Sequence, residues 1–214
     1  MSVLSESERD SRLDRRLALD DIRVVELCDW MAGPHAARLL ADLGADVIKI
    51  ELPGVLSSGR TAGTPEPSDP SRRLDFVLSA RNKRSVTLDI RTPRGREIFL
   101  ELIKTVDVLV ENFRPGTMEQ WGLEPEVSEA ANPRLVLLRI SGFGQTGPWA
   151  NRPGFDRVAQ AFGGLTYLTG MPEPCPWSPP CWAGTSVLAG PARRSRHGRA
   201  FSPGDRATHC QYCG

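Results

Sequence analysis

The sequence predicts an α/β fold, in which a Rossmann-like, mostly parallel sheet is flanked by helices. Segments rich in β-branched residues alternate along the chain with segments whose apolar residues recur at helical spacing. The connections between most of these segments are short, and the first strand, helix and second strand together predict a parallel βαβ unit. Alternation of this kind favours a doubly wound sheet over an all-helical or all-strand fold.

The first βαβ unit covers residues 22–51. Residues 22–28 predict a buried strand, because they are mostly β-branched and apolar. Gly33-Pro34 then predicts a break, and residues 35–43 predict a helix that Gly44 closes as a C-terminal cap. Residues 46–51 predict the second strand.

The following segments continue the alternation after one long connection. Residues 52–75 are rich in Pro, Gly and Ser and predict a long surface loop, which in a compact domain is often functional. Thr92-Pro93 predicts a helix start, because proline suits a first helical turn. The remaining predicted elements are a strand at 85–90, a helix to 104, a strand at 106–110, a helix at 126–131, a strand at 135–140 and a helix at 154–164.

Composition divides the chain into three parts and excludes some functions. We expect a disordered leader at residues 1–19, a Rossmann-like region at 20–170, and an irregular Pro/Arg-rich tail at 171–214 that is either disordered or frameshifted. A net charge of +1 gives no reason to expect nucleic acid or an anionic membrane as partner. No apolar run is long enough to span a membrane. Cys28, alone in an apolar strand, favours a reducing, cytoplasmic location.

Two polar groups are candidates for binding an anionic ligand. Arg81, Asn82, Lys83 and Arg84 precede a predicted strand, and cations with an amide suit phosphates, although a solvated charge run is the alternative. Residues 112–114 follow a predicted strand end, where α/β sheets bind ligands. We predict no metal site: residues 210–213 have the spacing of half a zinc site, without its other half.

Several short motifs occur in an order that resembles family III CoA-transferases. This family includes formyl-CoA and carnitine CoA-transferases and α-methylacyl-CoA racemases. The similarity covers residues 20–170. Its motifs are Ala32-Gly33-Pro34, residues 46–51 followed by Pro53-Gly54, Arg81-Asn82-Lys83-Arg84-Ser85, Glu111-Asn112-Phe113-Arg114-Pro115-Gly116, residues 140–148, and Pro153-Gly154-Phe155-Asp156.

The resemblance implies an incomplete CoA-transferase large domain. It implies acyl-CoA and a carboxylic acid as substrates, no permanently bound cofactor, and an interlocked homodimer, which we do not expect from a chain without the second domain. An aspartate of the family forms a covalent CoA thioester. The residues that the resemblance places at the CoA are Ala32, Gly33, Arg81, Asn82, Lys83, Arg84, Asn112, Phe113 and Arg114.

The sequence departs from the family pattern at the chemical centre. No carboxylate side chain lies between Glu173 and Asp205, where the nucleophilic aspartate is expected, so we predict no catalytic residue and an inactive, truncated chain. Reading across codon boundaries permits Leu-Gly-Gly-Asp-x-x-Ala-Gly at 181–190, which suggests a frameshift between residues 170 and 181. Phe155 replaces the racemase histidine, and Met31 replaces the glutamine of formyl-CoA transferases. A racemase relative and a non-catalytic CoA-binding module are the alternatives.

Overall fold

The core of the protein is a six-stranded sheet in which every neighbouring pair of strands is parallel. The computed structural model describes residues 17–54, 58–61, 74–165, 168 and 209–212. The strand order is β3-β2-β1-β4-β5-β6, the order of a doubly wound nucleotide-binding sheet. The strands are β1 (Arg23–Leu27), β2 (Asp46–Glu51), β3 (Lys83–Thr87), β4 (Val108–Glu111), β5 (Val136–Ile140) and β6 (His209–Tyr212).

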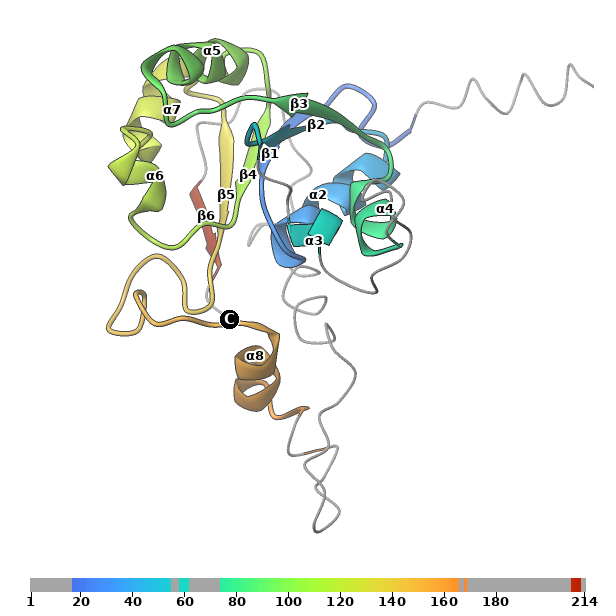
Figure 1. The fold of residues 1–214 in the computed structure, drawn as a ribbon, viewed down its shortest axis with the longest axis vertical. Coiled ribbons are helices and arrows are strands. Elements are labelled where there is room, and N and C mark those ends of the chain that lie inside the picture. The colour runs from blue at the N-terminus through green and yellow to red at the C-terminus, as the bar shows by residue number, and fades with distance from the viewer. Residues whose placement is uncertain (1–16, 55–57, 62–73, 166–167, 169–208, 213–214) are drawn as a thin grey trace, which may run out of the picture.

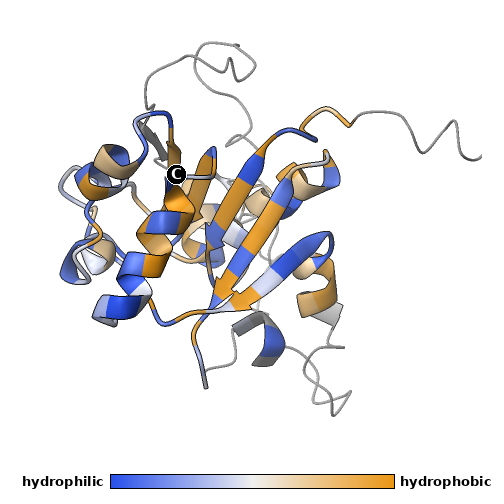
Figure 2. Ribbon diagram, turned by 90° about the horizontal axis from the view of Figure 1, so that it is seen from above, coloured by the Kyte–Doolittle hydropathy of each residue, from blue (hydrophilic) through white to orange (hydrophobic). Residues whose placement is uncertain are grey.

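Helices cover both faces of the sheet, because successive strand residues point to opposite sides. Val24 belongs to a buried cluster with the alanines of α2, whereas Val25 belongs to a second cluster with Phe99 of α5. Figure 1 shows α5, α6 and α7 on one side of the strands and α2, α3 and α4 on the other. Apolar residues dominate the central strands (Figure 2). The helices are α2 (Ala32–Asp42), α3 (Ser58–Thr61), α4 (Leu74–Ala80), α5 (Pro93–Ile103), α6 (Thr117–Gln120), α7 (Pro125–Ala131) and α8 (Asp156–Phe162).

The predicted fold class and most predicted elements are confirmed. Gly44 follows α2 with a φ of 108°, and Thr92 caps α5 by accepting a hydrogen bond from Gly95 N at 3.0 Å. The predicted break at Gly33-Pro34 is wrong: both residues lie in the first turn of α2, where proline lacks only an N–H that would be unpaired anyway. The predicted loop contains α3 and the start of α4, and α6 and β6 were not predicted.

The third strand begins earlier than the predicted 85–90. It spans Lys83–Thr87 at the edge of the sheet, and four of its five residues are exposed. Its apolar pattern is therefore weak, and its first residues are placed by ion pairs with residues of β1 and β2. Lys83 pairs with Glu26 of β1, and Arg84 pairs with Asp46 of β2.

Some predictions about the chain ends fall outside the described residues. These are the predictions for residues 1–16 and for 169–208, which include the expected position of the nucleophile. Residues 17–19 are described, and Leu19 N donates to Leu43 O at 3.0 Å. Within the described part of the chain, no helix is long and apolar enough to cross a membrane.

Glu51, at the end of β2, anchors the short helix α3. Its carboxylate accepts hydrogen bonds from Arg60 Nε at 3.0 Å, Arg60 Nη2 at 2.9 Å and Ser85 Oγ at 2.7 Å. The Arg60 guanidinium also lies 3.6 Å from the centre of the Phe76 ring, which connects α3 to α4. Burial opposes the charge on Glu51, but the hydrogen bonds outweigh burial and lower its pKa to about 2.

This low pKa predicts an acid-sensitive anchor. Because the pKa of Glu51 is lower in the folded chain than its ordinary value of 4.5, its stabilising contribution is complete above about pH 4.5 and is lost as the pH falls toward about 2. We expect the melting temperatures of the unmodified chain and of Glu51→Gln to differ at pH 6 and to converge near pH 2. A difference between the two that does not change with pH would contradict this assignment.

Candidate functional site at the carboxyl edge of the sheet

The strand order makes the carboxyl ends of β1 and β4 the switch point of the sheet, and we call the ligand position expected there the switch-point crevice. Connections leave these two central strands toward opposite sides of the sheet, and this switch point is where open α/β sheets bind ligands. Asp29 follows β1 and Asn112 follows β4. Their contacts bridge the two strand ends: Asp29 N donates to Asn112 Oδ1 at 2.9 Å, and Asn112 Nδ2 donates to Asp29 O at 2.6 Å.

Both oxygens of the Asp29 carboxylate accept hydrogen bonds from Ser58, the first residue of α3. The donors are Ser58 N at 2.7 Å and Ser58 Oγ at 2.6 Å. Because each of its oxygens already accepts a hydrogen bond, this carboxylate is not free to attack a substrate. Asp29 therefore positions the turn after β1, and we assign it no step in a reaction.

Ala32 and Gly33 form the first turn of α2, beside the crevice. Gly33 lies so close to β1 that a Cβ there would be 2.3 Å from Cys28 Sγ and 3.2 Å from Asn112 Cγ. Within the described residues, neither backbone N–H of this turn donates a hydrogen bond. Because the first N–H groups of a helix have no partner inside the helix, they are suited to an anionic ligand.

Asn112, Phe113 and Arg114 come after β4 on the same edge. The Phe113 ring packs edge-on against Trp121, with ring centres 5.0 Å apart, and Phe113 N donates to Glu111 Oε2 at 2.7 Å. Arg114 is exposed, and the described part of the chain holds no ion pair with its side chain. Of the predicted cationic residues, Arg114 is thus the one whose charge remains available beside the crevice.

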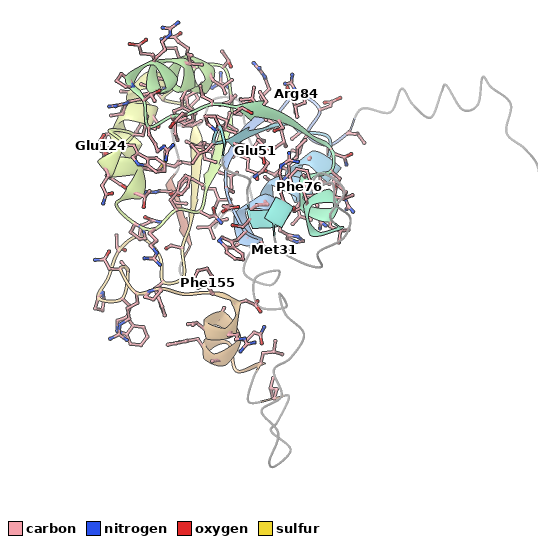
Figure 3. The ribbon with its side chains drawn as sticks, in the orientation of Figure 1. Met31, Glu51, Phe76, Arg84, Glu124 and Phe155 are labelled. Atoms are coloured by element: carbon pink, nitrogen blue, oxygen red, sulfur yellow. The ribbon has the colours of Figure 1, made fainter. Side chains whose placement is uncertain are left out.

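Arg81, Asn82, Lys83 and Arg84 lie at the other edge of the sheet. They occupy the amino end of β3, and Figure 3 shows Arg84 far from Met31 and Phe155, which lie at the carboxyl edge. Arg81 and Asn82 bind Asp42, and Arg84 binds Asp46. The structure does not bring this group together with Asn112–Arg114.

Lys83 points into the protein, where it shares Glu26 with Lys49. Glu26 is 0% exposed; its Oε1 accepts from Lys49 Nζ at 2.9 Å, and its Oε2 accepts from Lys83 Nζ at 2.6 Å. The ammonium groups also donate to Cys28 O at 2.8 Å and to Pro34 O at 2.7 Å. Burial lowers the pKa of Lys83, and Glu26 offsets only part of this effect; for Lys49, Glu26 outweighs burial and the pKa is raised.

A second buried ion pair supports the end of β4. Arg139 Nε donates to Glu111 Oε1 at 2.6 Å, and Arg139 Nη1 donates to Glu119 Oε1 at 2.8 Å. Burial raises the pKa of Glu111, although Arg139 offsets part of the effect. Glu119 and Arg139 also line a cavity of about 310 Å³ between α6, α7 and the loop after β5. Because Glu111 is occupied by Arg139 and Phe113 N, it is not a free nucleophile either.

Other common catalytic groups are not poised for reaction in the described residues. Burial raises the pKa of Cys28 well above its ordinary value, and its thiol donates to Val110 O at 3.3 Å. Burial, with the neighbouring Arg38, lowers the pKa of His35 and so favours its neutral imidazole. The described ranges contain no group of His, Cys, Asp or Glu side chains that could hold a metal ion.

Sequence reasoning missed several residues that build this edge. Asp29, Glu26 and Lys49 were not singled out from the sequence. Glu26 and Lys49 each lie within an apolar strand, and such a position indicates that the two charges form a buried ion pair. Trp30 was also missed. It has a φ of 58°, a left-handed conformation that no sequence pattern predicts for tryptophan.

Comparison with known proteins agrees with this architecture. The profile of CoA-transferase family III matches residues 19–190. The chain is 47% identical over 173 residues to the succinyl-CoA–L-malate CoA-transferase beta subunit of Chloroflexus aurantiacus, covering 81% of this chain and 41% of that protein. It is 40% identical over 164 residues to the succinate–glutarate CoA-transferase of Agrobacterium fabrum, covering 75% and 41%.

The fold of the chain is also similar to that of a solved structure. A CAIB/BAIF family protein from Brucella suis has a TM-score of 0.74 and 36% sequence identity, covering 92% of this chain and 53% of that one. The chain spans about two fifths of the length of the curated relatives that it matches.

Proposed function

The chain belongs to CoA-transferase family III, and from this premise we propose that it forms the coenzyme A-binding part of an enzyme that transfers CoA between carboxylic acids. The substrates in this proposal are an acyl-CoA and a free carboxylic acid. The observation that carries the proposal is the switch point of the sheet, where the Asp29–Asn112 hydrogen bonds hold the ends of β1 and β4 together.

Each residue around the crevice has a role in this proposal. The exposed Arg114 guanidinium binds a phosphate of CoA, as charge-assisted hydrogen bonds favour. The N–H groups of Ala32 and Gly33, which donate to no described residue, are further donors for the ligand, and Gly33 lets α2 lie close to Cys28. Asn112 positions the β1 turn, and Phe113 contributes an apolar surface.

Arg81, Asn82, Lys83 and Arg84 remain a predicted contact for the nucleotide end, and because they lie at the opposite edge of the sheet from Arg114, this part of the proposal requires CoA to extend from one edge to the other. Arg81 and Arg84 are 47% and 64% exposed, so exchanging their aspartate partners for phosphates costs little. Lys83 is 1% exposed, and withdrawing its ammonium from Glu26 would leave a buried carboxylate short of one partner. We therefore assign ligand binding here to the two arginines and Asn82, and a structural role to Lys83.

We further propose that this chain binds CoA without transferring it. The two carboxylates at the crevice, Asp29 and Glu111, are both occupied, and residues 174–204 contain no acid. A frameshift between residues 170 and 181 accounts for the missing aspartate. Sequencing the gene tests this explanation, because an uninterrupted reading frame through the segment would exclude it.

Calorimetric titration of the 214-residue chain with free CoA tests binding. We expect measurable heat of binding, and Arg114→Gln is expected to weaken the affinity at least about tenfold, because a hydrogen bond to a charged group contributes about 1.5–3 kcal/mol. Arg91→Gln is the matched control, since Arg91 is exposed but pairs with Asp89 away from the crevice. Absence of binding by the folded chain would refute the proposed function.

Incubation with an acyl-CoA and a second carboxylic acid separates transfer from binding alone. We expect no new thioester and no covalent CoA adduct by mass spectrometry. An aspartyl- or glutamyl-linked CoA on this chain would show that a nucleophile is present. Loss of the α-proton from a 2-methylacyl-CoA would instead favour the racemase alternative, for which Phe155 provides no base.

A further inference from the structure

Two exposed aromatic rings meet at the switch point. Trp30 lies in the turn between β1 and α2, and Phe155 directly precedes α8. Their ring centres are 6.3 Å apart in an edge-on arrangement, although the residues are 47% and 63% exposed. Figure 3 shows Phe155 at the same edge of the sheet as Met31, the neighbour of Trp30. This pair, Trp30 and Phe155, is an apolar surface beside a polar crevice.

The backbone holds Trp30 in this place against its conformational preference. Its φ of 58° is rare for a bulky residue, and such strained residues concentrate at ligand sites. The preceding residue, Asp29, is fixed by Asn112 on one side and Ser58 on the other. The hydrogen bonds of Asp29 therefore fix this turn, and they hold Trp30 where its ring contacts Phe155.

Phe155 is placed by a close contact between two glycines. A Cβ on Gly142 would lie 2.5 Å from Gly154 Cα, so the segment before α8 approaches the end of β5 more closely than any side chain allows. In the described part of the chain, the cation–π contacts involve Phe76 and Trp149, and neither Trp30 nor Phe155 has a guanidinium stacked on it. The pair therefore fits a hydrocarbon chain and offers no countercharge to a carboxylate.

We propose that the Trp30–Phe155 pair is the contact surface for an apolar acyl chain of the CoA thioester that occupies the switch-point crevice. This inference rests on the proposed function, because it requires CoA to bind there. It goes further by assigning the acyl group to two named rings. The pair adds affinity for acyl-CoA over free CoA, and it contributes nothing to the affinity for free CoA.

The test compares the dissociation constants of free CoA and butyryl-CoA for the 214-residue chain. Since each buried methylene group contributes about fourfold in affinity, we expect butyryl-CoA to bind at least about tenfold more tightly. Phe155→Ala is expected to reduce this ratio to about threefold or less while free CoA binds as before. Phe162→Ala is the matched control, because Phe162 is also 63% exposed but packs against Phe143 and Trp149.

A second variant tests whether a loss of the ratio in Phe155→Ala is caused by misfolding. Trp30→Gly removes the ring and suits the positive φ, so the backbone conformation is retained; it is expected to lower the ratio as Phe155→Ala does. If CoA binds but both variants keep the full butyryl-CoA preference, the inference is wrong and the proposed function stands. If neither ligand binds the folded, unmodified chain, both are wrong.

Discussion

Glu26→Gln is expected to lower the free energy of unfolding by about 3–5 kcal/mol, which is the cost of removing one partner from a buried ion pair. The amide cannot balance the charges of Lys49 and Lys83, whose side chains are 5% and 1% exposed. One of the two lysines must then lose its proton or draw water into the sheet. Urea denaturation followed by circular dichroism measures the loss.

Asp46→Asn is the control for the Glu26 variant. Asp46 also pairs with a cation between neighbouring strands, but its side chain is 38% exposed and that of Arg84 is 64% exposed. Surface pairs of this kind contribute about 0–1 kcal/mol, so we expect a small loss at most. Equal losses from the two variants would show that Glu26 is not a buried counter-ion.

Arg139→Leu is expected to have an effect of similar size, about 3–5 kcal/mol at pH 8, because it leaves Glu111 buried without its cation. Glu111 is 1% exposed and accepts from Arg139 Nε at 2.6 Å. The variant also removes the ion pair between Arg139 and Glu119. Both residues line the cavity between α6 and α7, and Arg139 is the only arginine among its lining residues. Chemical denaturation at several pH values measures both the size and the cause of the loss.

The pH dependence of Arg139→Leu distinguishes charge burial from lost packing. Burial already raises the pKa of Glu111 in the unmodified chain, and removing Arg139 raises it further. A carboxyl whose pKa is higher in the folded than in the unfolded chain stabilises the fold when protonated, and this contribution is lost as the pH rises through the folded pKa. The deficit should therefore shrink from pH 8 to pH 5. Arg94→Leu, an exposed helix residue paired with Glu97, should show no measurable loss at either pH.

Local patterns were sufficient to predict five of the six strands, since most strands in the interior of the sheet are buried and apolar. The prediction was weakest where tertiary contacts decide the structure. Lys83 illustrates this limit: its neighbours in sequence, Asn82 and Arg84, are exposed, and only the position of Glu26, 57 residues earlier, turns its side chain inward. The helix α6 has only four residues, too few to show a helical period.

The candidate site was predictable in part for the same reason. Asn112, Phe113 and Arg114 follow a recognisable strand, so their position at the carboxyl edge could be inferred from the sequence. The edge on which residues 81–84 lie depends on where β3 begins, and that boundary is set by ion pairs. The strained turn at Trp30 depends on a hydrogen bond to a residue 83 positions away from Asp29. No short sequence window contains both partners.

The bond between Asp29 and Asn112 also has a consequence for how the protein folds. Its partners are separated by 83 residues, and closing so long a loop carries an entropic cost before any contact is gained. During synthesis, the ligand crevice cannot exist until the ribosome has released the chain well past residue 112. The β1–β2 unit can form much earlier, because its strands are joined by a single helix. Under the proposed function, binding competence is therefore acquired late, in the step that pairs β1 with β4, and CoA would stabilise only chains that have completed that step.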